Sequence, residues 1–255
     1  MLKKQDVLNF PFNLGTSESF VNEILALARS NQSAYVCVAS VHQLIEAHQD
    51  ASFAKIPHAA NIVTPDGMPI TWALKILYGI RQERIPGMDL LPLLLKEAEK
   101  NSISVFFYGG TEPMLEKTNQ FVSKHFPKLQ VAGSYSPPFR PLTADEELNI
   151  AEMINQSRAQ LVFVVLGCPK QERWMYLMKG RIQSTMIGIG GALPVLVGIQ
   201  SRAPRWMQKN GLEWLYRLLQ EPRRLWKRYF VTNSKFIYLL TTEKFKRVFK
   251  LKTSI

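Results

Sequence analysis

Asp66 lies in the segment TPDGMP, directly after the apolar pair Ile62 and Val63. Ligands of open α/β sheets bind at the carboxyl ends of strands. A carboxylate at such an end can accept the proton of an attacking hydroxyl group. The same residues also suit an Asx turn, in which the aspartate bonds only to nearby backbone. Asp66 is therefore the candidate general base, with a structural turn as the alternative.

Two glycine pairs, Gly109 with Gly110 and Gly190 with Gly191, each follow an apolar run. Glycine lets the backbone approach a ligand closely, and the N–H groups of a helix start bind phosphate. Neither pair belongs to a GxGxxG fingerprint or a P-loop. Each pair is a candidate phosphate-binding turn, and a plain tight connection is the alternative.

The run LGCPKQERW covers residues 166–174 and places polar side chains after an apolar stretch. Gln171 can both donate and accept hydrogen bonds, which suits a sugar or a base edge. Lys170 carries a charge that can neutralise phosphate. An ordinary polar helix start explains the pattern equally well. Cys168 is expected to be a small buried residue and not a nucleophile.

His42 follows the apolar run Ala34–Ala39, and it is the histidine expected to face the ligand cleft at the strand ends, as Asp66 does. A lone histidine is more often a packing or surface residue, and that interpretation is kept for His48 and His58. The two cysteines have no metal-ligand spacing. No metal site and no disulfide framework are therefore predicted.

Arginines are concentrated after residue 200, and arginine binds phosphate groups through two parallel hydrogen bonds. One or more of them could clamp a diphosphate leaving group. A solvated, solubilising face is the alternative, but such a face has no use for the tryptophans among these charges. The arginines are Arg202, Arg205, Arg217, Arg223, Arg224 and Arg228, and the tryptophans are Trp206, Trp214 and Trp226.

The charge of the chain is uneven. The 255 residues carry 32 basic and 20 acidic side chains, a net charge of +12. Residues 200–255 hold 14 of the basic and three of the acidic ones, so +11 belongs to them and +1 to residues 1–199. This distribution implies an anionic partner: nucleic acid, anionic lipid or a phosphate-bearing substrate. The 46% hydrophobic content excludes disorder and collagen-like repeats.

Short apolar runs and helical patterns alternate through the first 199 residues. Runs that are apolar throughout predict strands buried on both faces, as in a parallel sheet. Helix starts are predicted at Thr111 and at the capping box of Thr143 and Glu146. The predicted strands are Ala34–Ala39, 103–108, 161–166 and 185–189.

After residue 199 the pattern is helical, basic and rich in aromatic side chains. Pro222 separates two predicted helices, and residues 229–249 suit an amphipathic helix at a membrane interface. No segment has the roughly 20 apolar residues of a membrane span. The start of the chain lacks the continuous apolar region of a signal peptide. A reducing cytosol is the simplest compartment.

Five segments taken in order resemble the WecG/TagA/CpsF glycosyltransferases. They are TPDGMP, RIPGMDL, FFYGG, GCPKQE and RAPRWMQKNGLEWLYRLLQEPRR, and they extend from about Ser40 to Arg228. The resemblance implies a Rossmann-like, mostly parallel α/β core, residues 1–199, with a basic helical appendage, residues 200–255. It also implies an inverting, metal-independent transfer of a hexose-type sugar from a nucleoside-diphosphate donor, UDP-linked, needing no cofactor. The implied acceptor is a saccharide on polyprenyl diphosphate at the inner face of a bacterial membrane.

The family pattern also implies roles for individual residues. Asp66 matches the proposed general base and Gln171 matches the glutamine of the PKQE motif. Arginines of the appendage close over the donor diphosphate in the family; the matching positions are Arg217 and Arg224, and Arg228 is a further candidate. Many relatives have Thr-x-Asn where this chain has Ser40 and His42, so a hydroxyl is kept and an imidazole replaces an amide. That difference is expected to affect which donor sugar binds.

Two rival interpretations remain from other classes of protein. Basic and aromatic surfaces also bind single-stranded nucleic acid, although no RRM, KH or helix-turn-helix signature is present. A non-catalytic membrane scaffold that kept the fold is the other. The expected partners are the sugar nucleotide, the lipid-linked acceptor and an anionic membrane surface, with no nucleic acid. The exposed appendage makes self-association possible, and the expected location is peripheral on the cytoplasmic side of the plasma membrane.

Overall fold

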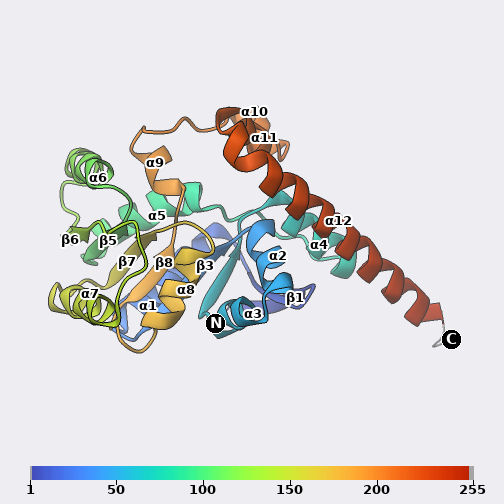
Figure 1. Ribbon diagram of the computed structural model, residues 1–255, viewed down its shortest axis with the longest axis horizontal. Helices are drawn as coiled ribbons and strands as arrows, with labels where there is room; N and C mark the ends of the chain where they lie inside the picture. Colours follow the sequence, from blue (N-terminus) through green and yellow to red (C-terminus); the bar gives the residue numbers. More distant parts are fainter. Residues whose placement is uncertain (1, 253–255) are drawn as a thin grey trace.

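The computed structural model describes residues 2–252, with side chains through Phe249, and it is built around one six-stranded parallel sheet (Figure 1). The order across the sheet is β4-β3-β8-β7-β5-β6. The α/β fold class with a parallel sheet is therefore confirmed. The strands are β3 (Ala34–Ala39), β4 (Ile62–Pro65), β5 (Val105–Gly109), β6 (Val131–Tyr135), β7 (Leu161–Val165) and β8 (Thr185–Gly188).

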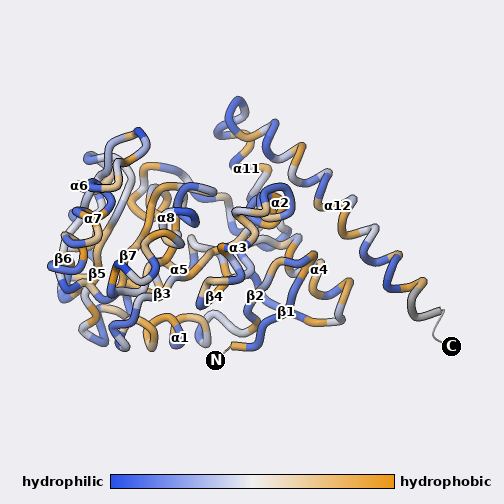
Figure 2. The backbone as a smooth tube through the Cα atoms, turned by 60° about the horizontal axis from the view of Figure 1, so that its bottom comes forward, coloured by the Kyte–Doolittle hydropathy of each residue, from blue (hydrophilic) through white to orange (hydrophobic). Residues whose placement is uncertain are grey.

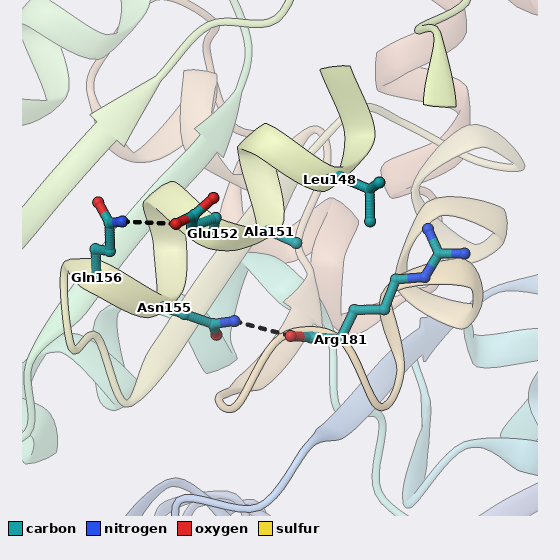
Figure 3. Close-up of a pocket in the computed structure, with 6 residues that line it drawn as sticks. All are labelled: Leu148, Ala151, Glu152, Asn155, Gln156 and Arg181. Atoms are coloured by element: carbon teal, nitrogen blue, oxygen red, sulfur yellow. Dashed lines mark hydrogen bonds between the residues drawn. The ribbon is translucent and has the colours of Figure 1, made fainter. Parts of the chain in front are cut away.

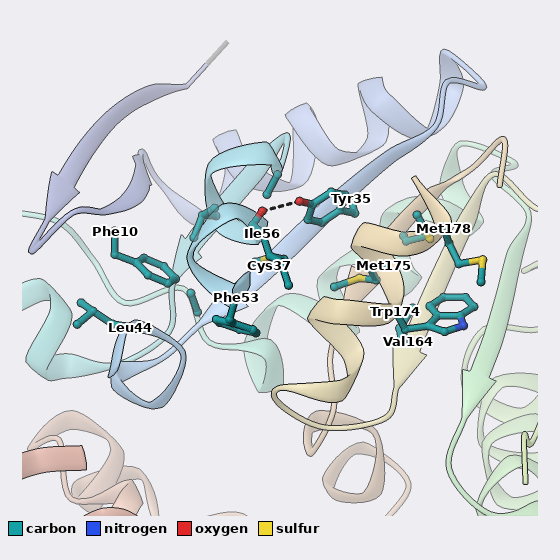
Figure 4. Close-up of a cluster of buried hydrophobic side chains, with 14 of the residues drawn as sticks. Phe10, Tyr35, Cys37, Leu44, Phe53, Ile56, Val164, Trp174, Met175 and Met178 are labelled. Atoms are coloured by element: carbon teal, nitrogen blue, oxygen red, sulfur yellow. Dashed lines mark hydrogen bonds between the residues drawn. The ribbon is translucent and has the colours of Figure 1, made fainter. Parts of the chain in front are cut away.

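Two hydrophobic clusters cover the two faces of this sheet, because successive side chains of a strand point to opposite faces. Tyr35 and Cys37 of β3 enter one cluster, and Val36 and Val38 enter the other. The first face packs against α2 (Val41–Gln49), α3 (Ala51–Ala59), α4 (Met68–Tyr78), α7 (Ala144–Gln156) and α8 (Lys170–Met178), as part of Figure 4 shows. The second packs against α1 (Ser17–Arg29), α5 (Gly87–Lys100), α6 (Glu112–His125) and α9 (Ala192–Leu196).

The predicted helix starts differ in how they are capped. Thr143 and Glu146 form the predicted capping box at the start of α7. Thr111 occupies the N-cap position of α6, but its side chain makes no capping hydrogen bond. The proline at the start of α6 already fixes one backbone angle and has no N–H group to satisfy.

An antiparallel hairpin, β1 (Lys3–Val7) and β2 (Phe10–Leu14), precedes the core and was not predicted. Its turn residues Leu8 and Asn9 both have positive φ angles. Phe10 and Phe12 are buried, and Asn13 accepts a hydrogen bond from the backbone of Val63 at 2.8 Å. The hairpin therefore supports β4, the strand that ends beside Asp66.

The chain ends in α10 (Arg205–Lys209), α11 (Glu213–Gln220) and α12 (Pro222–Lys252), which we call the appendage together with the loop before them. Residues 229–249 are not a separate segment, because α12 runs through them from Pro222 without a break. With 31 residues, it is about 46 Å long. Residues 253–255 of the predicted appendage lie outside the described residues.

One side of α12 lies on the core and the other is exposed. Phe236 is buried against α2, and Arg247 donates a hydrogen bond to the Tyr78 hydroxyl on α4 at 3.0 Å. Hydrophobic and hydrophilic residues alternate along this helix (Figure 2). Its exposed apolar side chains include Phe230, Ile237, Tyr238, Phe245 and Phe249. Within residues 2–252, no helix has the length and apolar character needed to cross a membrane.

Candidate active site

The carboxyl ends of the parallel strands bring most of the predicted residues to one edge of the sheet. Ser40 follows β3, Asp66 follows β4, Gly109 ends β5, Lys170 follows β7 and Gly190 follows β8. The helices after β5 and β7 lie on opposite faces, so a crevice opens between these two strands. This is the topological switch point, where the strand order reverses, and it is the usual ligand site of open α/β sheets.

Asp66 is half-buried and holds its place through its backbone, which donates a hydrogen bond to Ala39 of the neighbouring strand at 3.0 Å. Its carboxylate accepts no hydrogen bond from residues 2–249, so the Asx turn is not formed. Burial raises the pKa of Asp66 to about 6, against the opposing effect of the Arg84 and Arg217 cations. At neutral pH this group is an ionised base with more proton affinity than an ordinary aspartate.

Arg217 reaches this edge from the appendage. An added Cβ at Gly191 would lie 2.5 Å from Arg217 Nη2, so the guanidinium occupies the space over the glycine turn. The same guanidinium is close enough to lower the pKa of Asp66. The structure therefore brings together Asp66, the turn after β8 and one of the three predicted appendage arginines.

Two ion pairs fasten the appendage to the core near this point. Arg84 donates a hydrogen bond to Glu213 of α11, and both side chains are largely buried. Arg202 pairs with Asp89 of α5 at 2.5 Å. Sequence reasoning missed Arg84, although it lies inside the quoted RIPGMDL segment, because its partner is 129 residues away.

Arg224 and Arg228 are placed differently from Arg217. Arg224 pairs with Glu221 on its own side of the appendage, and its side chain is 59% exposed. It is not among the charges that shift the pKa of Asp66. Arg228 lies beside His42, where burial and this cation lower the imidazole pKa to about 4. His42 is therefore neutral at physiological pH, and its Nδ1 is buried without a hydrogen-bond partner in the described part of the chain.

Gln171 lies in the wall of the site and not on its surface. It is 4% exposed, and its Oε1 lies 3.1 Å from where a Cβ of Gly190 would be. Its Nε2 donates to Glu172 at 2.7 Å, and Gln43 of α2 donates to the same carboxylate oxygen at 3.0 Å. This polar cluster links the start of α8 to the start of α2 across β8. Gly188 and Gly190 leave the room that Gln171 occupies.

Glu172 is a buried carboxylate that sequence reasoning missed as a site residue. It is 1% exposed, and burial raises its pKa to about 7. The thiol of Cys168 lies close by, and burial raises the pKa of that thiol above its ordinary value. Cys168 is therefore a poor nucleophile, as the sequence predicts. The only signal for Glu172 was its place in the PKQE motif.

A cavity of about 250 Å³ opens at the crevice between β5 and β7. Tyr108 and Trp174 line it and stack on each other with their ring centroids 4.0 Å apart. The Tyr108 hydroxyl and the Trp174 Nε1 are buried and have no hydrogen-bond partner among residues 2–249. The rest of the lining comes from Gly110, Glu147, Lys170, the end of β7 and the proline-rich loop from Pro137 to Leu142.

A second pocket, of about 530 Å³, lies away from these residues (Figure 3). It is lined by α7 and by Arg181, which lies just before β8, so it is at the amino end of the strands. None of the predicted site residues borders it. Within the described part of the chain, no group of three His, Cys, Asp or Glu side chains is arranged to hold a metal ion.

Comparison with known proteins connects this geometry to an activity. Residues 5–250 match the model of the Glycosyl transferase WecG/TagA/CpsF family. A protein of Bacillus spizizenii (strain W23) is 32% identical over 199 residues, which are 78% of this chain and 75% of that protein. Proteins of Bacillus subtilis (strain 168) and Staphylococcus aureus (strain MW2) are each 28% identical, over 97% of this chain and 95% of theirs. All three are named N-acetylglucosaminyldiphosphoundecaprenol N-acetyl-beta-D-mannosaminyltransferase.

Proposed function

The chain belongs to the WecG/TagA/CpsF glycosyl transferase family, and we propose that it moves a hexose-type sugar from a UDP-linked donor to a saccharide on polyprenyl diphosphate, inverting the anomeric carbon without a metal ion. It is a glycosyltransferase of cell-surface polysaccharide synthesis. The relatives act on an undecaprenyl-diphosphate-linked sugar, as their names state. The observation that carries the mechanism is the position of the Arg217 guanidinium over the glycine turn after β8, close enough to lower the pKa of Asp66.

Asp66 acts as the general base in this mechanism. Its carboxylate takes the proton of the acceptor hydroxyl while that oxygen attacks the anomeric carbon of the donor sugar. The bond from the anomeric carbon to the diphosphate oxygen breaks on the opposite side, so the configuration inverts. The raised pKa of about 6 supports this role, because the group is ionised at pH 7 and still binds a proton well.

Arg217 and the backbone N–H of Gly191 stabilise the leaving diphosphate, whereas the N–H of Gly190 donates to the Val164 carbonyl at 3.3 Å. The guanidinium lies directly over the glycine turn, so both groups face the same space. Donors held in place before the reaction stabilise the charge that develops in the transition state. A cation and a backbone N–H group here take the role that a divalent metal has in other glycosyltransferases. Arg228 and His42 border the same edge and contribute to sugar recognition with Ser40.

The nucleoside of the donor occupies the cavity between β5 and β7. Neighbouring strands are about 4.8 Å apart, so three spacings separate β4 from β7 by about 14 Å. A sugar nucleotide can extend over such a distance from Asp66 to the cavity. The unpartnered Tyr108 hydroxyl and Trp174 Nε1 offer two hydrogen bonds to a base or ribose. Lys170 lines the same cavity and supplies a positive charge for a phosphate of the donor.

The appendage keeps the protein on the cytoplasmic face of an anionic bilayer. The exposed apolar side chains of α12 stand among basic residues, as in helices that lie in a membrane interface. Each basic residue near such a surface contributes about 1 kcal/mol of attraction. The acceptor itself is anchored in that membrane by its prenyl chain. Catalysis thus belongs to the core, residues 1–199, and membrane attachment to the appendage, residues 200–255. Arg217 is part of the appendage but acts in the catalytic site.

The rival interpretations do not agree with the family. A nucleic-acid-binding module is excluded as the primary function, because the chain matches a glycosyltransferase model over nearly its whole length. The relatives are named transferases, which also disfavours a non-catalytic scaffold.

The direct test is a screen of UDP-sugars for release of UDP in the presence of N-acetylglucosaminyl-diphosphoundecaprenol in detergent. We expect acceptor-dependent release with one donor and unchanged release in excess chelator. NMR of the product linkage reports the inversion. Activity lost with chelator and restored by Mg²⁺ or Mn²⁺ contradicts the metal-free mechanism, and no transfer from any donor contradicts the function.

A further inference from the structure

The helix α4 starts only two residues after Asp66, so it leads directly away from the proposed base. Its inner face is fully buried in the core through Ile70, Ala73 and Leu74. Its outer face carries Trp72, which is 48% exposed, and Ile76, which is 45% exposed. Residues four apart lie on the same side of a helix, so both belong to one stripe that begins at the site.

Residues of the appendage contact α4 at both ends of the stripe. At the start of α4, the backbone of Gly211 lies against Met68 and Trp72, since an added Cβ would be 3.2 Å and 3.5 Å from their side chains. At its end, Arg247 of α12 bonds to the Tyr78 hydroxyl. The appendage therefore borders α4 without covering Trp72 and Ile76, and Figure 1 shows α4 alongside α12.

We propose that the apolar stripe of Trp72 and Ile76 on α4 binds the first isoprene units of the lipid-linked acceptor. This inference rests on the proposed function, since it concerns the tail of the acceptor whose hydroxyl meets Asp66. A sugar diphosphate at Asp66 must continue into a prenyl chain, and the rise of the helix places Ile76 about 12 Å from Met68. The stripe is the apolar surface that continues from the base along that direction.

A second copy of this chain is a poor occupant of the stripe. A specific dimer interface needs about 800 Å² from each partner, and two half-exposed side chains supply only a small part of that area. A flexible apolar chain can bind to a much smaller apolar surface than a dimer interface requires.

The test compares two acceptors with one headgroup, N-acetylglucosaminyl diphosphate, carried on an undecaprenyl chain or on a methyl group that has no isoprene unit. Both are assayed in the same detergent micelles with wild type, Trp72→Glu and Ile76→Glu. We expect either substitution to raise KM for the long-chain acceptor about five- to tenfold. KM for the methyl acceptor and kcat for both should stay within twofold of wild type.

Leu148→Glu is the matched control, because Leu148 is a 53% exposed apolar residue on α7, far from Asp66. It should leave both acceptors unaffected. Ile76→Glu is included because Ile76 lies one helical turn further along α4 than Trp72, the residue that packs against Gly211. Equal losses on both acceptors, no loss on either, or a change of oligomeric state in light scattering overturns the proposal. Wild type that transfers to neither acceptor contradicts the proposed function instead.

Discussion

The carboxyl edge of the sheet and the appendage above it are held by different forces. At the edge, Gln171, Glu172 and Gln43 form hydrogen bonds inside a buried wall, and Asp66 is fixed by the backbone of two strands. The appendage is joined to the same edge by a few ion pairs and by one side of α12. The proposed base, Asp66, therefore lies on a rigid frame, whereas Arg217 belongs to a segment that can separate more easily.

Changing Asp66 to asparagine tests the carboxyl edge of the sheet and should have the largest effect on activity. The amide cannot accept the hydroxyl proton, and general-base assistance is worth about 10²- to 10⁴-fold. We expect kcat to fall by that factor while donor KM and the melting temperature change little. Asp6→Asn, at an exposed position of the hairpin, is the control.

The pH profile of wild type checks the same residue independently. Since Asp66 must be ionised and its pKa is raised to about 6, kcat/KM should rise about tenfold per pH unit below 6 and level off above it. Residual activity of Asp66→Asn should lack this limb. A limb at the same pH in the variant would assign the titration to another group.

Substitutions of Arg217 and Arg224 test the appendage. Arg217→Ala removes the cation over the glycine turn and should lower kcat/KM about 10²- to 10³-fold, the usual cost of losing one charge-stabilising donor. Arg224→Ala removes an exposed side chain paired with Glu221 and should cost less than fivefold. Steady-state kinetics with the full-length variants decide the matter. Equal losses would mean that the appendage rearranges to bring both arginines to the donor.

Glu172→Gln tests the polar wall and should have the smallest effect. Burial raises the pKa of Glu172 from 4.5 to about 7, so the folded protein binds more protons than the unfolded chain between these values. Stability therefore falls as the pH rises through this range. The substitution removes that penalty, and its gain in unfolding free energy should be about 2.5 kcal/mol larger at pH 8 than at pH 5.

Urea unfolding of wild type and Glu172→Gln at both pH values measures this gain. The exposed Glu116→Gln on α6 is the control and should show no such difference. A variant that is less stable than wild type at pH 8 would show that the ionised carboxylate is well satisfied by its two amide donors.

The sequence predicted the parts of the fold that local patterns determine. The apolar runs at β3 and β7 predicted buried parallel strands, and Thr143 with Glu146 marked the start of α7. The β1–β2 hairpin escaped because the proline of β2 interrupts the alternation that marks a strand. The sequence predicted residues 229–249 as a separate segment because the composition changes there, although the helical period continues from Pro222.

Pairs formed by tertiary packing lay beyond the sequence. Nothing local connects Arg84 to Glu213, and Glu172 looks like any acidic residue in the first turn of a helix. Asp66, Gln171 and the glycine turns were found because their residue types mark strand ends. Only the structure separates Arg217, which lies over the turn, from Arg224, which does not.

The bare backbone at Gly191 has an evolutionary consequence. Because the Arg217 guanidinium fills the place where a side chain would begin, an alanine at 191 would force the end of the Arg217 side chain away from the turn. A descendant with alanine at 191 would therefore lose this contact or carry another residue at 217. In an alignment deep enough to reveal covariation, positions 191 and 217 should therefore change as a pair, although 26 positions separate them along the chain.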